Sequence, residues 1–274
     1  MSSPLQGKLV LLGAGKMGGA MLQGWLERGV EPSQVVILDP SPPPETQALI
    51  TRHGLKHNPP VGTLTGVEVI LVAVKPQVME DVLPSVASLA PQKPLVLSVA
   101  AGKTIASFER HFGKGAAVIR SIPNTPAAVG RGITAMVANA HVSKAQRALA
   151  AALLSAIGEV VEVDDEALID VATAVSGSGP AYIFYMTDCL AKAGIAQGLP
   201  PDVAMKLARA TVAGAGELMR VTGISAEQLR INVTSPKGTT YAALQVLMAP
   251  ENGLEPLMTK AVEAATVRSR ELAG

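Results

Sequence analysis

The feature that most constrains this chain is a short apolar run near its start that leads into a glycine-rich turn. Residues 9–12 (LVLL) predict a strand, residues 13–18 (GAGKMG) a turn and residues 21–28 a helix. A strand, a G-x-G-x-x-G turn and a helix in that order form the phosphate-binding part of a dinucleotide-binding fold. An ordinary strand-to-helix turn is the competing interpretation, but this turn opens a β-α-β unit, which favours dinucleotide binding.

Each glycine of the turn has a predicted role. Gly13 permits the tight turn, Gly15 lets the backbone approach a pyrophosphate, and Gly18 lets the helix lie against the strand. Lys16 and Met17 belong to the same turn. The free N–H groups at the following helix start should face the phosphates, whose negative charge the helix dipole favours.

Strands and helices alternate through about residue 163, which predicts an α/β fold with a Rossmann-like, doubly wound, mostly parallel sheet. Further strands are predicted at residues 35–38, 67–74, 95–99, 116–119 and 132–137, and helices at residues 45–53 and 78–89. In such sheets ligands bind beyond the carboxyl ends of the strands. One crevice should therefore be lined by residues 13–18, Asp39, Lys75, residues 100–102 and Asn124.

Asp39 ends the second predicted strand, about 20 residues after the glycine turn, where the dinucleotide pattern expects an acid. A carboxylate there would accept hydrogen bonds from the adenosine ribose and repel a 2′-phosphate, so it favours NAD over NADP. The alternative is a turn-forming aspartate before Pro40. Ser41 lies close enough in sequence to touch the ribose.

The second half of the chain is rich in alanine, leucine and methionine at helical spacing. It predicts an all-helical part, so the chain divides into a dinucleotide-binding domain (1–163) and a helical dimerisation and substrate domain (164–274). Helices are predicted at residues 166–174, 181–196, 201–221, 226–232, 239–249 and 254–272. A domain this small and apolar should bury surface against a second copy, which predicts at least a homodimer. A self-contained helical bundle is the less favoured alternative.

Two segments of the helical half place hydroxyls and glycine directly before a helix. They are residues 175–182 (VSGSGPAY) and 233–240 (VTSPKGTT). A helix start with free N–H groups and Ser/Thr donors suits a carboxylate or phosphate. Simple helix capping explains each segment taken alone, but together they offer a second wall for a substrate.

Composition excludes several classes of function. Lys plus Arg is 23, Asp plus Glu is 22 and aromatic residues are 3%, so a nucleic-acid surface is not expected. The single cysteine rules out an intrachain disulfide and fits a cytoplasmic protein. The histidine spacings predict no metal site. No apolar run approaches the roughly 20 residues of a membrane span, so no membrane contact is expected.

Taken together, the motifs resemble the pyrroline-5-carboxylate reductase family over essentially the whole chain. The resemblance rests on GAGKMG, AVKPQ (73–77), SVAAG (98–102), RSIPNTP (120–126), SGSGPAY (176–182) and NVTSPKGTT (232–240), of which the last two are the most specific. It implies hydride transfer from NAD(P)H to the C=N carbon of 1-pyrroline-5-carboxylate, giving L-proline in the last step of proline biosynthesis.

The resemblance also implies roles for individual residues. The dinucleotide should contact the glycine turn, Ser41, Asn58, Ala73, Val74, Lys75, Pro76, Ala100, Ala101 and Asn124, with Asn58 reaching the adenosine ribose. Ser178 should lie where nicotinamide and substrate meet. Ser235 and the amides of Gly238 and Thr239 should bind the substrate carboxylate, and the Thr240 hydroxyl should lie near the imine nitrogen. No Asp, Glu or His in these motifs is an obvious acid, so the imine should arrive protonated or take its proton from water.

Lys237 departs from the family pattern, which usually has two glycines after Ser-Pro. If this position needs a positive φ, lysine strains it; if not, lysine is harmless or adds positive charge near a carboxylate. Three other functions fit the sequence less well. A β-hydroxyacid dehydrogenase needs a lysine one turn after the glycines at 177 and 179, and none is present. A dinucleotide sensor would not need the hydroxyl-rich helix starts, and a structural oligomer leaves the first half unexplained.

Overall fold

The structure is a computed structural model that describes residues 5–273, and it divides into two compact units. The sheet unit comprises Met1–Gly177 and Ala265–Gly274, and the helical unit comprises Ser178–Ala264. Each unit is described by itself.

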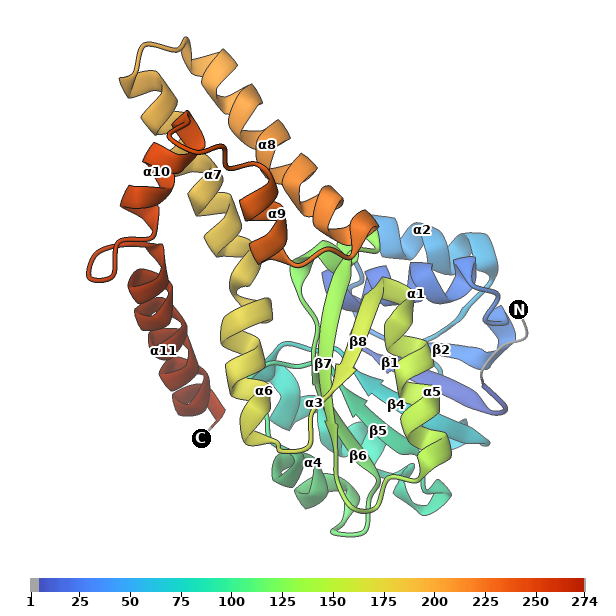
Figure 1. Cartoon of the computed structure of the whole chain (residues 1–274). Coiled ribbons are helices and arrows are strands. Elements are labelled where there is room, and N and C mark those ends of the chain that lie inside the picture. Colours follow the sequence, from blue (N-terminus) through green and yellow to red (C-terminus); the bar gives the residue numbers. More distant parts are fainter. Residues whose placement is uncertain (1–4, 274) are drawn as a thin grey trace. The chain divides into compact units, whose positions relative to one another are not determined.

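The sheet unit holds an eight-stranded sheet in the order β3-β2-β1-β4-β5-β6-β7-β8 over the described residues (Figure 1). All neighbouring strands in it are parallel except β6 and β7. The order reverses between β1 and β4, the point at which such sheets bind ligands. The strands are β1 (Lys8–Leu12), β2 (Val35–Leu38), β3 (Lys56–His57), β4 (Val67–Val72), β5 (Leu95–Ser98), β6 (Val118–Ile122), β7 (Gly132–Ala138) and β8 (Gly158–Glu162).

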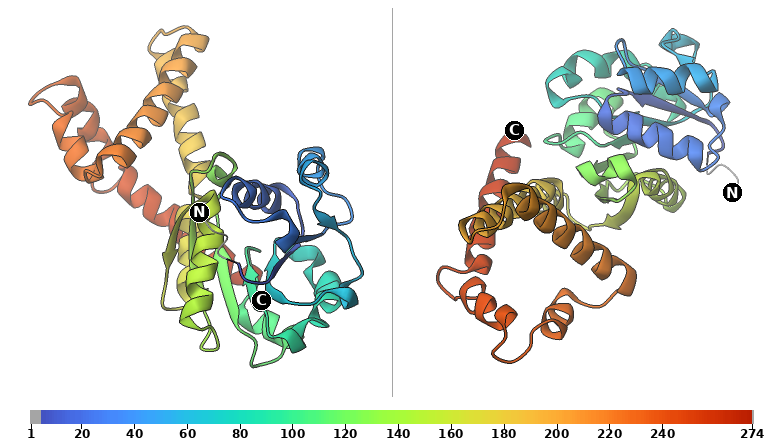
Figure 2. Two further views of the ribbon diagram at one scale, coloured as in Figure 1. Left: turned by 90° about the vertical axis from the view of Figure 1, so that its right-hand side faces the viewer. Right: turned by 90° about the horizontal axis from the view of Figure 1, so that it is seen from above.

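Helices cover both faces of this sheet, and each face has its own core (Figure 2). Alternate residues of the β-branched and leucine-rich strands point to opposite faces. On one face Trp25 of α1 packs with α5 and donates its indole N–H to the carbonyl of Leu153 (2.8 Å). On the other face α3 and α4 contribute Met79, Leu83 and Phe108, all fully buried.

Most of the helices in both units lie where the sequence predicts them. They are α1 (Lys16–Glu27), α2 (Pro44–His53), α3 (Met79–Ala87), α4 (Ile105–Phe112), α5 (Lys144–Leu154), α6 (Ala167–Ala172), α7 (Gly179–Ala196), α8 (Pro201–Thr222), α9 (Ala226–Asn232), α10 (Thr239–Leu247) and α11 (Leu254–Ala273). Helix α11 begins in the helical unit and ends in the sheet unit. The predicted fold class, a Rossmann-like sheet followed by a helical part, is confirmed.

Local differences from the prediction have simple causes. Helix α1 begins at Lys16, not residue 21, because two further glycines do not break a helix packed on a sheet. Strands β3 and β8 and helices α4 and α5 were not predicted. β3 has only two residues, and β8 (GEVVE) is largely exposed, so neither has a strong apolar pattern. Strand β6 extends to Ile122 and buries Arg120, because the charge is paired.

The helical unit buries little apolar surface of its own. Its buried apolar side chains are those of Ala191, Ala204 and Ala208, where α7 and α8 pack side by side. Large apolar side chains face outward instead; Phe184 is 67% exposed and Val246 72% exposed. Exposed apolar surface of this kind is typical of a region that binds another protein chain, a ligand or a membrane.

One helical run is longer than the sequence suggested. The helix continues past Gly177 and Gly179 through a π-helical segment, η7 (Thr173–Gly177), so that Ala167–Ala196 forms a run of 30 residues that contains an 18-residue window with a mean hydropathy of 1.2. By length and composition alone this run could cross a membrane, contrary to the expectation from the sequence, which treated the glycines as breaks. Its first turns pack in the sheet unit, where Ile169 is buried.

Candidate active site

The turn after β1 makes close contacts that only glycine permits. Gly13 has φ +89°, and a Cβ there would lie 2.8 Å from Cγ1 of Val74. A Cβ on Gly18 would lie 2.3 Å from the carbonyl oxygen of Gly13, so any larger residue would push α1 away from β1. The roles predicted for these two glycines therefore have a steric basis.

Gly15 is the open member of the turn. Apart from its chain neighbours, no heavy atom of the described residues lies within 4 Å of the position that a Cβ on Gly15 would take. Gly15 is the N-cap of α1, so the N–H groups of residues 16–18 have no acceptor within the helix. An open surface faced by these N–H groups and by the positive end of the helix dipole fits the pyrophosphate of a dinucleotide.

The predicted cofactor residues of this part of the site follow four neighbouring strands, β2, β1, β4 and β5, at one edge of the sheet. The N–H of Gly13 bonds to the carbonyl of Leu38 (2.9 Å), and the N–H of Ala73 bonds to that of Leu12 (2.8 Å). The first residue past β5 bonds in the same way to the last residue of β4 (3.0 Å). The glycine turn, Asp39 and the segments 73–76 and 100–101 therefore share this edge.

Asp39 contacts the glycine turn directly. Its Oδ2 accepts the N–H of Ala14 (2.6 Å), and its Oδ1 accepts the N–H of Ser41 (2.8 Å). A carboxylate has about four acceptor sites, so two remain for ribose hydroxyls. The two interpretations of Asp39, a turn residue and a ribose ligand, are thus compatible.

Asn58 and His57 hold the main chain of Asp39. Asn58 has φ +47°, and its side chain accepts the N–H of Asp39 (2.9 Å) and donates to the carbonyl of Asp39 (2.8 Å). Nε2 of His57 lies 2.9 Å from the same carbonyl and 3.1 Å from Nδ2 of Asn58, so its tautomer decides whether it donates to the carbonyl or accepts from the amide. His57 was not singled out from the sequence, since β3 is too short and polar to stand out.

Asn124 follows β6, and its side-chain amide is bonded at both ends. Oδ1 accepts the N–H of Ile133 (3.0 Å), and Nδ2 donates to the carbonyl of Ser176 (3.1 Å). Ser178, two residues beyond Ser176, is the N-cap of α7. Asn124 is therefore joined to η7, which the sequence did not indicate.

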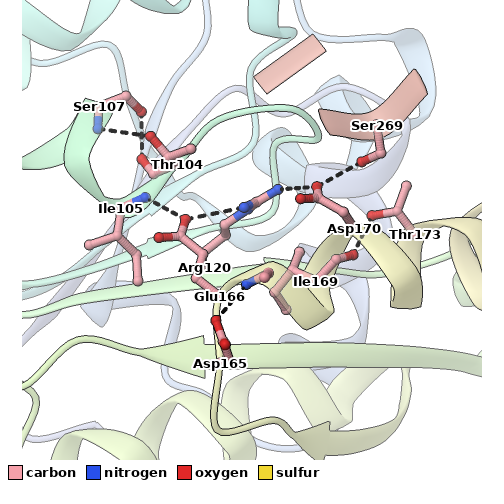
Figure 3. Close-up of polar contacts among 11 residues, drawn as sticks. Thr104, Ile105, Ser107, Arg120, Asp165, Glu166, Ile169, Asp170, Thr173 and Ser269 are labelled. Carbon is pink, nitrogen blue, oxygen red and sulfur yellow. Dashed lines mark hydrogen bonds and ion pairs between the residues drawn. The ribbon is translucent and has the colours of Figure 1, made fainter. Parts of the chain in front are cut away.

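A buried ion-pair cluster is centred on Arg120 of β6 (Figure 3). Arg120 is 3% exposed and pairs with Glu166 and Asp170, each at 3.1 Å. Glu166 also accepts the N–H of Ile105 (2.8 Å), and the hydroxyl of Ser269 donates to Asp170 (2.8 Å). The cluster joins β6, α4, α6 and the end of α11. Residue spacing alone gave no signal for it, because its members lie up to 149 positions apart in sequence (120 to 269).

The predicted substrate residues lie together at the start of α10 in the helical unit. The carbonyl of Ser235 accepts the N–H of Gly238 (3.1 Å), and a Cβ on Gly238 would lie 2.3 Å from Oγ of Ser235. In the described chain no side chain caps this helix, so the N–H groups of Thr239 and Thr240 have no acceptor within it. The arrangement suits a carboxylate.

Lys237 adopts φ +60° in this loop. The conformation is left-handed, which is unfavourable for a side chain other than glycine or asparagine. The condition under which lysine strains the loop is therefore met. Lys237 is exposed and directly precedes the N-cap Gly238.

Glu80, Lys103 and His111 form a surface cluster on the segments that follow β4 and β5. Nε2 of His111 lies 3.0 Å and Nζ of Lys103 3.5 Å from the carboxylate of Glu80. The hydrogen bond from His111 lowers the pKa of Glu80, and the charge of Lys103 adds to this effect. Glu80 thus stays ionised and partly neutralises Lys103.

Two further observations concern metal-binding groups and a hollow beside α1. In the described part of the chain, no group of three or more His, Cys, Asp or Glu side chains is placed to hold a metal. A hollow of about 770 Å³ lies between α1, α2 and residues 127–130, and Lys16 is the predicted cofactor residue that lines it.

Two family models match the chain. The model described as "NADP oxidoreductase coenzyme F420-dependent" matches residues 8–102, and "Pyrroline-5-carboxylate reductase dimerisation" matches residues 166–272. The first covers the glycine turn and the strand ends as far as Gly102, and the second covers most of the helical half.

The fold and the dinucleotide-binding edge define an NAD(P)H-dependent oxidoreductase. A pyrroline-5-carboxylate reductase of Synechocystis is 41% identical over 267 residues, which are 97% of this chain and 98% of the relative. The chain belongs to the pyrroline-5-carboxylate reductase family. The solved structure of such a reductase from Coxiella burnetii has a TM-score of 0.91 at 33% identity, covering 98% of this chain and all of that one. A Plasmodium falciparum pyrroline carboxylate reductase with NADP bound has a TM-score of 0.80 at 27% identity, covering 98% and 99%.

Proposed function

We propose that this protein reduces the C=N bond of 1-pyrroline-5-carboxylate to give L-proline, the last step of proline biosynthesis. The observation that carries the proposal is the 41% identity to a named reductase over almost the whole of both chains. A bound NADH or NADPH supplies the hydride, which goes to the ring carbon of the C=N bond while the nitrogen keeps or gains one proton.

In this proposal the strand-end edge binds the dinucleotide. The turn residues Gly13, Gly15, Lys16, Met17 and Gly18 receive the pyrophosphate at the start of α1. Asp39, Ser41 and Asn58 surround the adenosine ribose. The remaining contacts come from the segments after β4, β5 and β6, namely Ala73, Val74, Lys75, Pro76, Ala100, Ala101 and the main chain of Asn124, whose side-chain amide is bonded at both ends within the protein.

The start of α10 binds the substrate. Ser235 and the amides of Gly238 and Thr239 hold the carboxylate, and the Thr240 hydroxyl faces the imine nitrogen. Ser178 contacts the reacting groups from the start of α7. Since the motifs contain no acidic side chain or histidine for the task, the substrate binds as the protonated iminium or takes its proton from water.

We propose that NADH is the preferred cofactor. The carboxylate of Asp39 lies beside the glycine turn, where it would repel the 2′-phosphate of NADPH. The NADP-bound relative from P. falciparum shows that members of this fold accept the phosphorylated form, so the proposal concerns the ratio of the two activities.

The helical part, residues 164–274 in the predicted division, is proposed to form a homodimer or a larger homo-oligomer. The exposed apolar side chains of α7, α8 and α10 support this, as does the matching dimerisation model. A second copy would also cover the apolar run in residues 167–196, so membrane contact is not part of the proposal. Nucleic-acid binding is not part of the proposal either. A cytoplasmic location is proposed because the single cysteine fits a reducing compartment.

The test is oxidation of NADH and of NADPH at 340 nm with 1-pyrroline-5-carboxylate. Turnover with either supports the activity, and the ratio of the two kcat/KM values tests the cofactor proposal. A protein that binds dinucleotide and turns over neither would contradict the proposed reaction.

A further inference from the structure

We propose that Asn124 is a positioning residue: its side chain fixes the π-helical segment η7 and so sets the position of Ser178. The effect on turnover rests on the proposed function. The tether itself rests only on contacts within the sheet unit.

The Asn124 side chain is held so that only an amide satisfies it. It is 8% exposed, its Oδ1 accepts the N–H of Ile133 on β7 (3.0 Å), and its Nδ2 donates to the carbonyl of Ser176 (3.1 Å). One partner is a donor and the other an acceptor, which fixes the orientation of the amide. An aspartate of the same shape would place an oxygen against the Ser176 carbonyl oxygen. The sheet thus holds η7 through a specific bond.

The segment that Asn124 grips is irregular by itself. π-Helical turns are rare and occur mostly as single bulges at functional sites. Here the hydroxyls of Thr173 and Ser176 donate to the carbonyls of Ile169 (2.7 Å) and Ala172 (2.9 Å), so side chains compete with the helical hydrogen bonds. A segment with such competing bonds needs an outside contact to select one arrangement.

Strand β6 and its extension supply two such contacts. Arg120 holds Asp170 before η7 begins, and Asn124 holds Ser176 near its end. In addition, Ile122 packs on Gly177, where an added Cβ would lie 3.6 Å from the Ile122 side chain. The RSIPNTP segment thus holds the helical run just before the bulge and at its last two residues, and Ser178 follows directly after Gly177.

The expected consequence is confined to the chemical step. A displacement of a reacting or orienting group by about 1 Å costs roughly 100-fold in rate. Because the Asn124 amide is engaged by the protein, its loss should lower kcat while the affinity for the dinucleotide stays nearly the same.

The experiment compares Asn124→Asp and Asn124→Ala with the same changes at Asn139, a matched control at the opposite end of the β6–β7 pair. Asn139 also uses its whole amide, accepting from Val118 N (3.2 Å) and donating to the carbonyl of Ala116 (2.9 Å). Measured quantities are kcat and KM for 1-pyrroline-5-carboxylate, Kd for NADH, thermal unfolding, and hydrogen exchange of the amides of residues 173–178.

We expect both Asn124 variants to lose about 10- to 100-fold in kcat and to exchange faster at residues 173–178, with Kd for NADH changed less than about threefold. The Asn139 variants should lose stability while keeping kcat and this protection. In a Ser178→Ala background, Asn124→Asp should cost little more, since it acts through Ser178.

A loss of NADH affinity in the Asn124 variants instead would make the side chain a cofactor contact and overturn the proposal, as would unchanged exchange at residues 173–178. The exchange measurement does not depend on the substrate, so it decides the tether even if the wild-type protein fails to turn over the imine, a result that would count against the proposed function.

Discussion

The main-chain N–H of Ala14 donates a 2.6 Å hydrogen bond to the carboxylate of Asp39, which ties the glycine turn to the end of β2. One side chain therefore carries two tasks that the sequence offered as alternatives. It holds the glycine turn, and in the proposed cofactor site it would also place a negative charge beside the 2′-phosphate of NADPH.

Two substitutions separate these tasks. Asp39→Asn removes the charge and keeps an acceptor, so we expect the ratio of kcat/KM for NADPH over NADH to rise about tenfold, or about 1.4 kcal/mol. Asp39→Ala also removes the bond to Ala14; since hydrogen bonds to charged groups contribute about 1.5–3 kcal/mol, binding of both dinucleotides should weaken by about tenfold or more. Asp165→Asn is the control, because the Asp165 carboxylate likewise accepts a main-chain N–H, that of Ala167 (2.9 Å), away from the proposed cofactor site. An unchanged ratio in both Asp39 variants would leave Asp39 as a turn residue only.

Lys237 offers a test of strain against charge. Lys237→Gly should raise the free energy of unfolding by about 1 kcal/mol. A non-glycine residue at positive φ costs about 1–3 kcal/mol, which the substitution relieves. Part of this stabilisation is offset because glycine loses more backbone entropy on folding. KM for the carboxylate substrate should rise several-fold, since a cation beside the α10 start is lost. Denaturant unfolding and steady-state kinetics measure the two effects.

The matched control is Lys93→Gly, since Lys93 has φ +53° in a turn before β5. It should stabilise the protein similarly and leave KM unchanged. Lys237→Gln keeps the strain and removes the charge, so it should raise KM without a gain in stability. If KM is the same in all three variants, the cation has no part in substrate binding.

The sequence predicted those features that depend on local pattern. Continuous apolar runs gave β1, β4 and β5, and the glycine spacing gave the turn, because strand burial and positive φ leave direct marks in composition. It did not predict the Arg120 cluster, the role of His57 or the π-helical segment. The Arg120 cluster and the role of His57 depend on contacts between residues distant in sequence, and the π-helical segment has no residue spacing that distinguishes it from an α-helix interrupted by glycine.

Arg120 should be important for stability. Removing one partner from a buried ion pair costs about 3–5 kcal/mol, because the remaining charges stay buried and unpaired. We expect that loss in the free energy of unfolding for Arg120→Met, and a smaller loss for Asp170→Asn. Arg147→Met removes the exposed pair with Glu162 and should cost about 0–1 kcal/mol. Equal losses of unfolding free energy in Arg120→Met and Arg147→Met would show that the buried cluster contributes no more to stability than an exposed ion pair.

Thr240 and Thr239 form a natural pair for testing the substrate site. The proposal uses the hydroxyl of Thr240 but only the amide of Thr239. Thr240→Ala should lower kcat for the imine about tenfold, a loss of about 1.4 kcal/mol in the transition state, and leave Kd for NADH nearly unchanged. Thr239→Ala should change neither by more than about twofold. A large loss of NADH binding in Thr240→Ala would place this residue on the other ligand.

The helical unit gives the last prediction, which concerns assembly. Among its described residues the buried apolar side chains are alanines, whereas Phe184 of α7 is 67% exposed in the single chain. Full burial of a phenylalanine contributes about 1.5–3 kcal/mol, and burying an unpaired carboxylate costs several kcal/mol. Phe184→Asp should therefore shift the protein from dimer or larger oligomer toward monomer, with loss of stability, in sedimentation equilibrium. Lys192→Ala, on the same helix with its side chain 68% exposed, should keep the wild-type mass. A wild-type protein that stays monomeric and folded up to tens of micromolar would show that this apolar surface is not covered by a second copy.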